Sequence, residues 1–243
     1  MKFWLLFIAC IIIEIIFTPL FLKAQWPGMC LKSLTYKMIC STAFVSIGVL
    51  SMIISDNKTT YAIMMLAGLA FGWLGDYFLH AKPTNTYFAL GLVSFMVGHI
   101  VYIACYIRTL PVISPDYNMF NAVELAAIIS LLVVAVVLAK KFKVAFSTNL
   151  LKVAVVAYTF VLILMFIKAT SLGVNYCLTG ASDGIFAVIV LTLGSLCFVL
   201  SDASLSIILF GGEKRNKPLK VFNIVTYFAG QVMLASSILF IKG

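Results

Sequence analysis

Four ionisable residues interrupt long apolar stretches of this sequence: Glu14, Asp76, His99 and Asp202. A charged side chain at the centre of a membrane helix costs roughly 2.5–3.5 kcal/mol on insertion scales, so each is by default a candidate for a functional site. Carboxylates in unlike surroundings can divide the work of acid and base, and a histidine can shuttle protons. These residues therefore predict either acid–base catalysis or a proton relay within a membrane.

Milder polar residues fall in the same stretches, namely Tyr102, Ser201, Tyr227 and Gln231. Tyr102 follows His99 by three positions, so the two share one face of a helix, and we expect Tyr102 to hold His99 in place. Gly98 would let another helix approach that face. A buried glutamine such as Gln231 often serves only to link two helices by a hydrogen bond. We therefore expect some of these residues to bind substrate and others to hold helices together.

The composition requires a membrane around these residues. Of the 243 residues, 63% are hydrophobic and only 10% are charged, and the mean hydropathy is +1.15. A soluble domain of this size could not hide so much apolar surface. In lipid the backbone must satisfy its own hydrogen bonds, which leaves helices or a closed barrel. The apolar runs are long and do not alternate with polar residues, so they predict helices.

Eight apolar segments are long enough to span a bilayer, each near 20 residues. They cover roughly 3–22, 33–54, 61–80, 86–107, 120–139, 148–169, 184–210 and 219–241. Proline, glycine or charged residues mark the breaks between them. No linker is long enough to separate two domains. We predict an all-α polytopic transmembrane bundle that forms a single domain over residues 1–243.

The basic residues are distributed unevenly between the two ends of these segments. The net charge is +9, with 17 Lys and Arg against 8 Asp and Glu. Twelve fall on one side: Lys23, Lys32, Lys37, Lys82, Lys140, Lys141, Lys143, Lys152, Lys214, Arg215, Lys217 and Lys220. The other side has Lys2, Lys58, Arg108, Lys168 and Lys242. The positive-inside rule then places both termini on the non-cytoplasmic side. Anionic lipid, and not nucleic acid, is the expected partner of this charge.

The cysteine pattern argues against a disulfide or zinc framework, and the N-terminal stretch argues against a cleaved signal peptide. The six cysteines are scattered, with no Cys-x-x-Cys pair and no histidine at ligand spacing, so neither a disulfide framework nor a zinc site is indicated. The N-terminal apolar stretch is interrupted by Glu14 and is followed by no small-residue cleavage site. We therefore expect it to be a retained first helix and not a signal peptide.

Because successive helices cross the membrane in opposite directions, residues far apart in the sequence can lie at similar depths in the membrane. Asp76, Asp202 and Lys32 all fall in the cytoplasmic half of the membrane, while His99 and Gln231 fall near its midplane. One cavity that opens to the cytoplasmic side would gather all five. Lys32 could bind a lipid phosphate there, pair with Asp76, or simply anchor a helix end.

Four motifs occur in order along the chain: Gly75-Asp76; Gly91-Leu92 with Phe95, Gly98-His99 and Tyr102; Ser201-Asp202 with Leu205; and Tyr227 with Gln231. Together they resemble the lysoplasmalogenase family of membrane proteins, also called YhhN-like, over roughly residues 30–240. Lys32-Ser33-Leu34-Thr35 is similar to the family's Lys-Pro-Leu-Thr, and Tyr158 and Met165 also match family positions. Gly72 stands where many members have serine, and Glu14 matches no family motif.

The resemblance implies hydrolysis of the vinyl ether bond of lysoplasmalogens, which gives a fatty aldehyde and a glycerophosphocholine or glycerophosphoethanolamine. It implies no cofactor and no metal. A lysophospholipid and the bilayer are the expected partners, and the oligomeric state is open. The implied catalytic residues are Asp76, Asp202 and His99, and the implied substrate-binding residues are Lys32, Tyr102, Ser201, Tyr227 and Gln231. We expect a multi-pass protein of a bacterial inner membrane, with its site toward the cytoplasmic half.

The chemistry of that reaction suits two carboxyl groups. Protonation of the β-carbon of a vinyl ether gives an oxocarbenium-like cation, which water then attacks, and two carboxyls can divide these tasks as they do in glycoside hydrolysis. Burial away from water favours the neutral form of a carboxyl. Asp202 lies about 12 Å from the end of its helix, so we expect it to be the acid and Asp76 the base. The reverse assignment stays open.

Three other functions fit the same residues. A proton-coupled carrier could use the intramembrane Asp and His residues as a relay. The Gly-Asp and Ser-Asp segments share a weak similarity that hints at a duplication, although no pair of broken helices accompanies it. A metal-dependent hydrolase could bind its ion with two Asp and one His, with His80 as the only other histidine. A structural or lipid-binding protein without turnover is the third.

Overall fold

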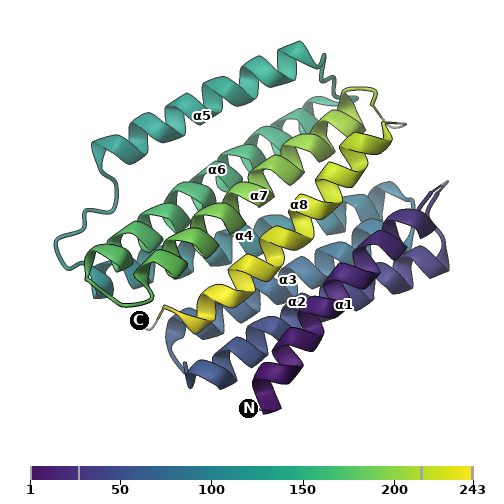
Figure 1. The fold of residues 1–243 in the computed structure, drawn as a ribbon. Helices are drawn as coiled ribbons and strands as arrows, with labels where there is room; N and C mark the ends of the chain where they lie inside the picture. The colour runs from purple at the N-terminus through teal and green to yellow at the C-terminus, as the bar shows by residue number, and fades with distance from the viewer. Residues whose placement is uncertain (1, 27, 214–215, 242–243) are drawn as a thin grey trace.

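The computed structural model describes residues 2–26, 28–213 and 216–241, and within these ranges it contains helices and no strand. The helices are α1 (Lys2–Ala24), α2 (Leu31–Ser55), α3 (Thr60–Ala81), α4 (Asn85–Ile113), α5 (Ala122–Lys141), α6 (Asn149–Leu178), α7 (Gly184–Phe210) and α8 (Lys217–Ser236). A short 3-10 helix, η1 (Ser237–Leu239), follows α8. All eight α-helices are long and apolar enough to cross a membrane (Figure 1). The prediction of an eight-helix, all-α multi-pass membrane protein is confirmed.

Polar caps fix where several helices begin. The side chains of Thr59, Thr84, Asn121, Thr148 and Asn216 each accept a hydrogen bond from a backbone amide in the first turn of the helix that follows. Such caps satisfy amides that have no partner inside the helix. The predicted starts lie within two residues of the observed ones because these capping residues also mark the breaks in the apolar pattern.

Two helices run well beyond their predicted ends. Helix α4 continues to Ile113, through Pro111 in its last turn, and α6 continues to Leu178. The extra turns of α6 contain polar residues, which apolar periodicity cannot recognise as helix. Ser171 in these turns donates a hydrogen bond to Glu124 of α5, and Asn175 donates to the carbonyl of Ser171 at 2.8 Å. The polar turns of α6 therefore lie where this helix contacts the start of α5.

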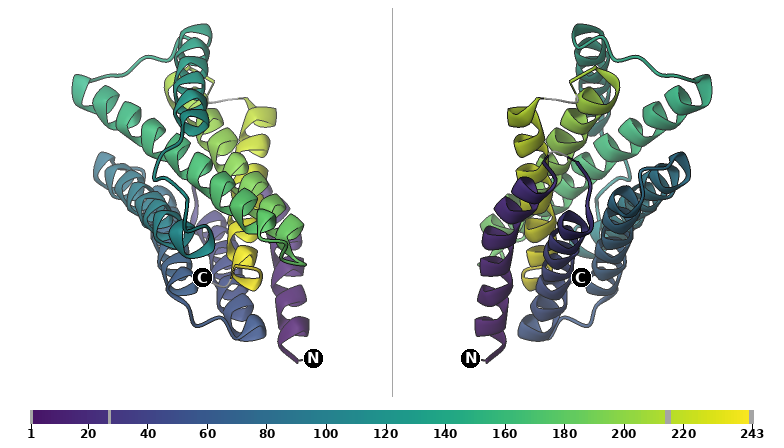
Figure 2. Two further views of the ribbon diagram at one scale, coloured as in Figure 1. Left: turned by 90° about the vertical axis from the view of Figure 1, so that its left-hand side faces the viewer. Right: turned by 90° about the vertical axis from the view of Figure 1, so that its right-hand side faces the viewer.

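Six helices form a closed ring in the order α2, α3, α4, α6, α7 and α8, with α8 returning to α2. Helix α1 packs outside this ring against α2 and, less extensively, α8, and it lies at one edge of the bundle in both side views (Figure 2). Helix α5 is set apart from the others, beside α6 (Figure 1). The centre of the ring is thus the place where residues from six helices can meet.

The basic residues gather where α1, α3, α5 and α7 end and the next helices begin, which we call the basic end of the bundle. Both chain termini lie at the opposite end (Figure 1). Lys168, which we counted as a basic residue of that opposite end, is instead fully buried inside α6. Lys214, Arg215 and Lys242 of the count lie outside the described residues. Which side of the membrane each end faces stays a prediction.

Candidate functional site

A small pocket lies at the centre of the helix ring. It is lined by Gly68, Gly72, Phe95, Gly98, His99, Tyr102, Phe198 and Gln231. About 170 Å³ of empty space lies here in gaps too narrow to admit a water molecule. We expected a cavity open toward the cytoplasmic side, and that expectation is wrong for this conformation. Large side chains packed into the ring close the space.

Asp76 of α3 anchors one side of the site. Its Oδ1 lies 3.0 Å from Nζ of Lys37, and its Oδ2 accepts hydrogen bonds from Ser41 Oγ at 2.6 Å and from Tyr227 Oη at 2.7 Å. The side chain is only 1% exposed. An ammonium partner and two hydroxyl donors are what a buried carboxylate needs to remain stable. The four residues come from α2, α3 and α8 and form one ion-paired network.

Asp202 of α7 anchors the opposite side. Tyr158 of α6 donates a hydrogen bond to Asp202 Oδ2 at 2.5 Å, and Tyr158 Oη also lies 3.1 Å from His99 Nε2. His99 Nε2 is itself 4.0 Å from Asp202 Oδ2. Among the described residues, neither Lys nor Arg comes within 4.0 Å of this carboxyl. Asp202 therefore has a hydroxyl and an imidazole as neighbours where Asp76 has an ammonium group.

Both networks reach the central pocket. Gln231 Nε2 donates to Tyr227 Oη at 3.0 Å, which connects the pocket to Asp76. On the other side His99 is both a wall of the pocket and a neighbour of Asp202. Three buried atoms on the walls have no protein partner within the described residues: His99 Nδ1, Tyr102 Oη and Gln231 Oε1. Unpaired buried polar atoms are costly, so these atoms are natural points for a ligand to form hydrogen bonds.

Glycines allow the helices to approach closely enough to form this pocket. A Cβ on Gly72 would lie 2.6 Å from Gln231 Nε2, and a Cβ on Gly68 would lie 2.2 Å from the ring of Tyr102. Both would collide with pocket side chains. A side chain at position 72 would therefore meet Gln231, whose amide fills that space.

Aromatic rings complete the walls. The rings of Phe95 and Phe198 each meet the ring of Tyr227 edge-on, with centroids 5.8 and 5.7 Å apart. Phe198 also packs edge-on against His99 at 5.2 Å. Aromatic rings can stabilise a nearby cation through the negative charge of their faces.

Six of the eight predicted site residues come together here: Asp76, His99, Tyr102, Asp202, Tyr227 and Gln231. The other two lie elsewhere. Lys32 is exposed near the start of α2, with its Nζ 5.8 Å from the ring centroid of Tyr36. Ser201 accepts a hydrogen bond from Asn223 of α8 at 2.9 Å. Ser201 therefore links α7 to α8, and Lys32 does not pair with Asp76.

Two further expectations about the site need correction. We expected Tyr102 to hold His99, but the hydroxyl that lies within hydrogen-bonding distance of His99 is that of Tyr158, from another helix. We also expected Asp202 to be the more enclosed carboxyl. It does lie farther from its helix end than Asp76, but its side chain is 17% exposed and that of Asp76 is 1% exposed. Distance along a helix does not report how tightly neighbouring helices surround a side chain.

Lys37 and Ser41 are the residues that the sequence analysis missed. They lie one helical turn apart on α2, and both contact Asp76. The signal was present, because Lys37 falls inside the apolar segment at 33–54, where a lysine is as unusual as an aspartate. We counted Lys37 only among the basic residues that indicate membrane topology, and so did not consider it as a partner of Asp76. Among the described residues, no group of three His, Cys, Asp or Glu side chains is arranged to hold a metal.

A sequence model of the YhhN family matches residues 33–238. The chain belongs to the YhhN family. This is the family of lysoplasmalogenases, and it is associated with hydrolase activity. The YhhN match includes all six ring helices, apart from the first residues of α2, and leaves out α1. No curated protein and no solved structure matches the chain.

Proposed function

We propose that this YhhN protein hydrolyses the vinyl ether bond of lysoplasmalogens, releasing a fatty aldehyde and glycerophosphocholine or glycerophosphoethanolamine. One observation carries the proposal beyond the family match. Asp76 is linked to the wall of one buried pocket through Tyr227 and Gln231, and Asp202 is linked to it through Tyr158 and His99. Only Asp76 has an ammonium partner. Two carboxyls in unlike surroundings are the arrangement that acid–base hydrolysis of an ether requires.

The surroundings assign the two roles. Lys37 balances the charge of an Asp76 carboxylate, which makes Asp76 the base that activates water. Asp202 has no such cation and takes the role of acid. Tyr158 donates a hydrogen bond to its Oδ2 and also lies within hydrogen-bonding distance of His99. Depth along the helix leads to the same assignment, but the presence of a cation beside Asp76 alone is the stronger reason.

The reaction then runs in two steps. Asp202 gives its proton to the β-carbon of the vinyl ether, and the α-carbon becomes an oxocarbenium ion. Asp76 removes a proton from water as the water oxygen bonds to that carbon, which yields a hemiacetal. The hemiacetal collapses when the ether oxygen receives the proton from Asp76 and its hydroxyl returns a proton to Asp202. One water is consumed, and both aspartates regain their starting states.

The pocket walls suit the cation and the polar part of the substrate. Phe95 and Phe198 line the space in which the positive charge develops, and Tyr227 packs edge-on against both. The unpaired atoms of Tyr102, Gln231 and His99 are available to the ether and glycerol oxygens. These contacts would orient the alkenyl ether between the two carboxyls, and orientation is a large part of catalysis.

The test replaces each aspartate with asparagine. Asp76→Asn and Asp202→Asn should each lower aldehyde release from 1-alkenyl-glycerophosphocholine in detergent by roughly 10²-fold or more, the scale of acid–base catalysis. Asp116→Asn, in the exposed α4–α5 loop, is the matched control and should keep full turnover. If both pocket variants fold normally and retain near-normal turnover, the two-carboxyl mechanism is wrong.

Isotope labelling tests the first step separately. When the reaction is run in D₂O and quenched quickly, the aldehyde should contain one deuterium at the carbon next to the carbonyl, because that carbon receives the acid's proton. Aldehyde formed without this label would contradict protonation at the β-carbon.

A proton-coupled carrier is the second candidate. The observation in its favour is the Asp202–Tyr158–His99 chain, which resembles the proton relays found inside transporters. Substrate-dependent flux in proteoliposomes, with no hydrolysis of any lysolipid in a panel, would favour this candidate over the enzyme.

A further inference from the structure

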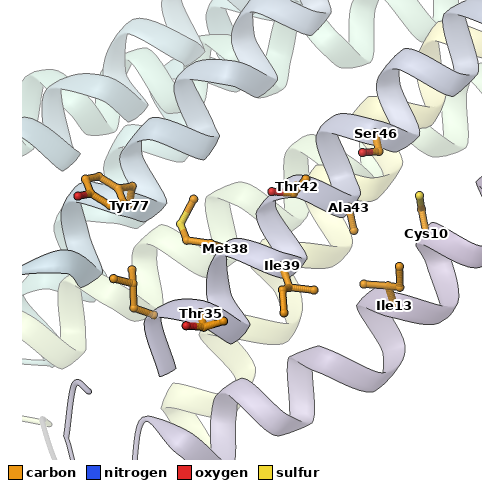
Figure 3. A pocket seen from close by; sticks show the side chains of 10 residues that line it. Cys10, Ile13, Thr35, Met38, Ile39, Thr42, Ala43, Ser46 and Tyr77 are labelled. Atoms are coloured by element: carbon orange, nitrogen blue, oxygen red, sulfur yellow. The ribbon is translucent and has the colours of Figure 1, made fainter. Parts of the chain in front are cut away.

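A second cavity lies away from the ring centre. It is a groove of about 550 Å³ on the outer face of α2, with α1 on one side and α3 on the other (Figure 3). Its lining residues are Cys10, Ile13, Leu34, Thr35, Met38, Ile39, Thr42, Ala43, Ser46 and Tyr77. Helices α1 and α3 both pack against α2 much more than against each other, which leaves this groove between them. It faces the lipid of a membrane and not the ring.

The groove and the central pocket lie on opposite faces of α2. Thr35, Thr42 and Ser46 line the groove, whereas Lys37 and Ser41 contact Asp76. At 3.6 residues per turn, these two sets point to different sides of the helix. Helix α2 is therefore a wall between them, and a molecule in the groove does not enter the pocket.

The groove is mostly apolar, and a lysine and two aromatic residues lie beside it toward the basic end of the bundle. Lys32 precedes Thr35 by three positions and Ile39 by seven, so it lies on the groove side of α2. Tyr77 is 39% exposed and stacks with Trp73, with ring centroids 6.5 Å apart. Tyrosine, tryptophan and lysine together are typical of the level at which lipid head groups lie.

We propose that this groove binds a phospholipid of the surrounding membrane. One hydrocarbon chain lies against Ile13, Ile39 and Ala43, and the phosphate meets the Lys32 ammonium and the Thr35 hydroxyl. Apolar surface matches the chain and positive charge matches the phosphate. The proposal is independent of the reaction, and it explains why Lys32 is directed away from the central pocket.

The bound lipid has a structural consequence for α1. Glu14 of α1 is buried at 6% exposure, and both of its carboxylate oxygens have no hydrogen-bond partner within the described residues. Helix α1 therefore brings a costly polar group to its contact with the ring. A chain that fills the space between α1 and α3 adds apolar contact on the groove side and holds α1 in place.

Native mass spectrometry of the full chain in mild detergent tests the proposal. The probes are dioleoyl phosphatidylglycerol and dioleoylglycerol, which has the same chains without the phosphate. The wild-type protein should retain one phosphatidylglycerol and several-fold less dioleoylglycerol. Ser46→Trp, which fills the groove from a half-buried position, should lose retention of both lipids several-fold. Lys32→Gln should reduce phosphatidylglycerol to the level of dioleoylglycerol.

Two variants serve as matched controls. Val49→Trp puts the same ring on an exposed position of α2 beyond the groove, and Lys23→Gln removes an exposed charge at the end of α1. Both should retain lipid as the wild-type protein does. Unchanged retention in Ser46→Trp and Lys32→Gln would overturn the proposal, as would equal loss in the controls. If Ser46→Trp does not fold, the test is the retention of phosphatidylglycerol relative to dioleoylglycerol, compared between the wild-type protein and Lys32→Gln.

Discussion

Lys32 and Lys37 are five residues apart on α2 but face about 140° apart at 3.6 residues per turn. Lys37 points into the ring and pairs with Asp76 at 3.0 Å, while Lys32 is exposed on the outer face. Both are lysines near the same helix end, and charge counting treats them alike. Only the direction of each side chain decides which one belongs to the site.

We predict that Lys37→Gln lowers turnover at least tenfold, because it leaves the Asp76 carboxylate buried without its cation. Lys37→Arg keeps the positive charge and should recover part of the activity. Aldehyde release across a range of pH values measures both variants, with Lys140→Gln at the exposed end of α5 as the control. Wild-type turnover in a well-folded Lys37→Gln protein would remove Lys37 from the mechanism.

At the scale of elements, α5 differs most from its neighbours. It lies beside α6 with most of its large apolar residues exposed to lipid, and only Glu124 and Ile128 are buried. Lys168 of α6 pairs with Glu124 at 2.9 Å, and the hydroxyls of Tyr117 and Ser171 also donate to that carboxylate. A buried ion pair therefore attaches one end of α5 to α6, beside the apolar contact of Ile128 with Ile163 and Ile167.

This attachment predicts a stability effect that is separate from activity. Lys168→Met should lower the free energy of unfolding by about 3–5 kcal/mol, because it leaves Glu124 as an unpaired buried charge. The double variant Glu124→Gln with Lys168→Met should be less destabilised than the single one. Thermal unfolding in detergent measures both. Below the unfolding temperature turnover should be unchanged, since α5 contributes no residue to the pocket; a double variant less stable than Lys168→Met would contradict this.

At the scale of the whole molecule, the second half repeats the layout of the first. Gly68 precedes Asp76 by eight residues, and Gly194 precedes Asp202 by eight. The helix after each carboxyl contains an aromatic-x-x-Gly motif followed by a polar residue, which is Phe95 to His99 in one half and Tyr227 to Gln231 in the other.

The contacts repeat as well. A Cβ on Gly98 would lie 3.2 Å from the Gly68 carbonyl oxygen, and one on Gly230 would lie 2.9 Å from that of Gly194. Each aspartate accepts a hydrogen bond from a hydroxyl group of the preceding helix: Asp76 from Ser41 of α2, and Asp202 from Tyr158 of α6. The pocket therefore lies between two similar four-helix halves, α1–α4 and α5–α8.

A chain cut between these halves should still assemble. Residues 1–115 and 116–243, expressed together with a tag on one piece, should copurify and release aldehyde, because α4 packs on α6 and α8 packs on α2 across the cut. Each piece alone should be inactive, since it holds only one of the two aspartates. Pieces that do not copurify from the same membranes would show that the halves cannot form independently.

The sequence by itself determined the eight helices, their membrane setting and six of the residues that meet at the ring centre. It could do so because apolar length and intramembrane charge are local properties of the chain. The partners of each carboxyl, the exclusion of Lys32 and Ser201, and the closure of the pocket were decided only by tertiary structure. Those features depend on how helices distant in sequence turn toward each other, and packing between helices, not periodicity within one, sets that rotation.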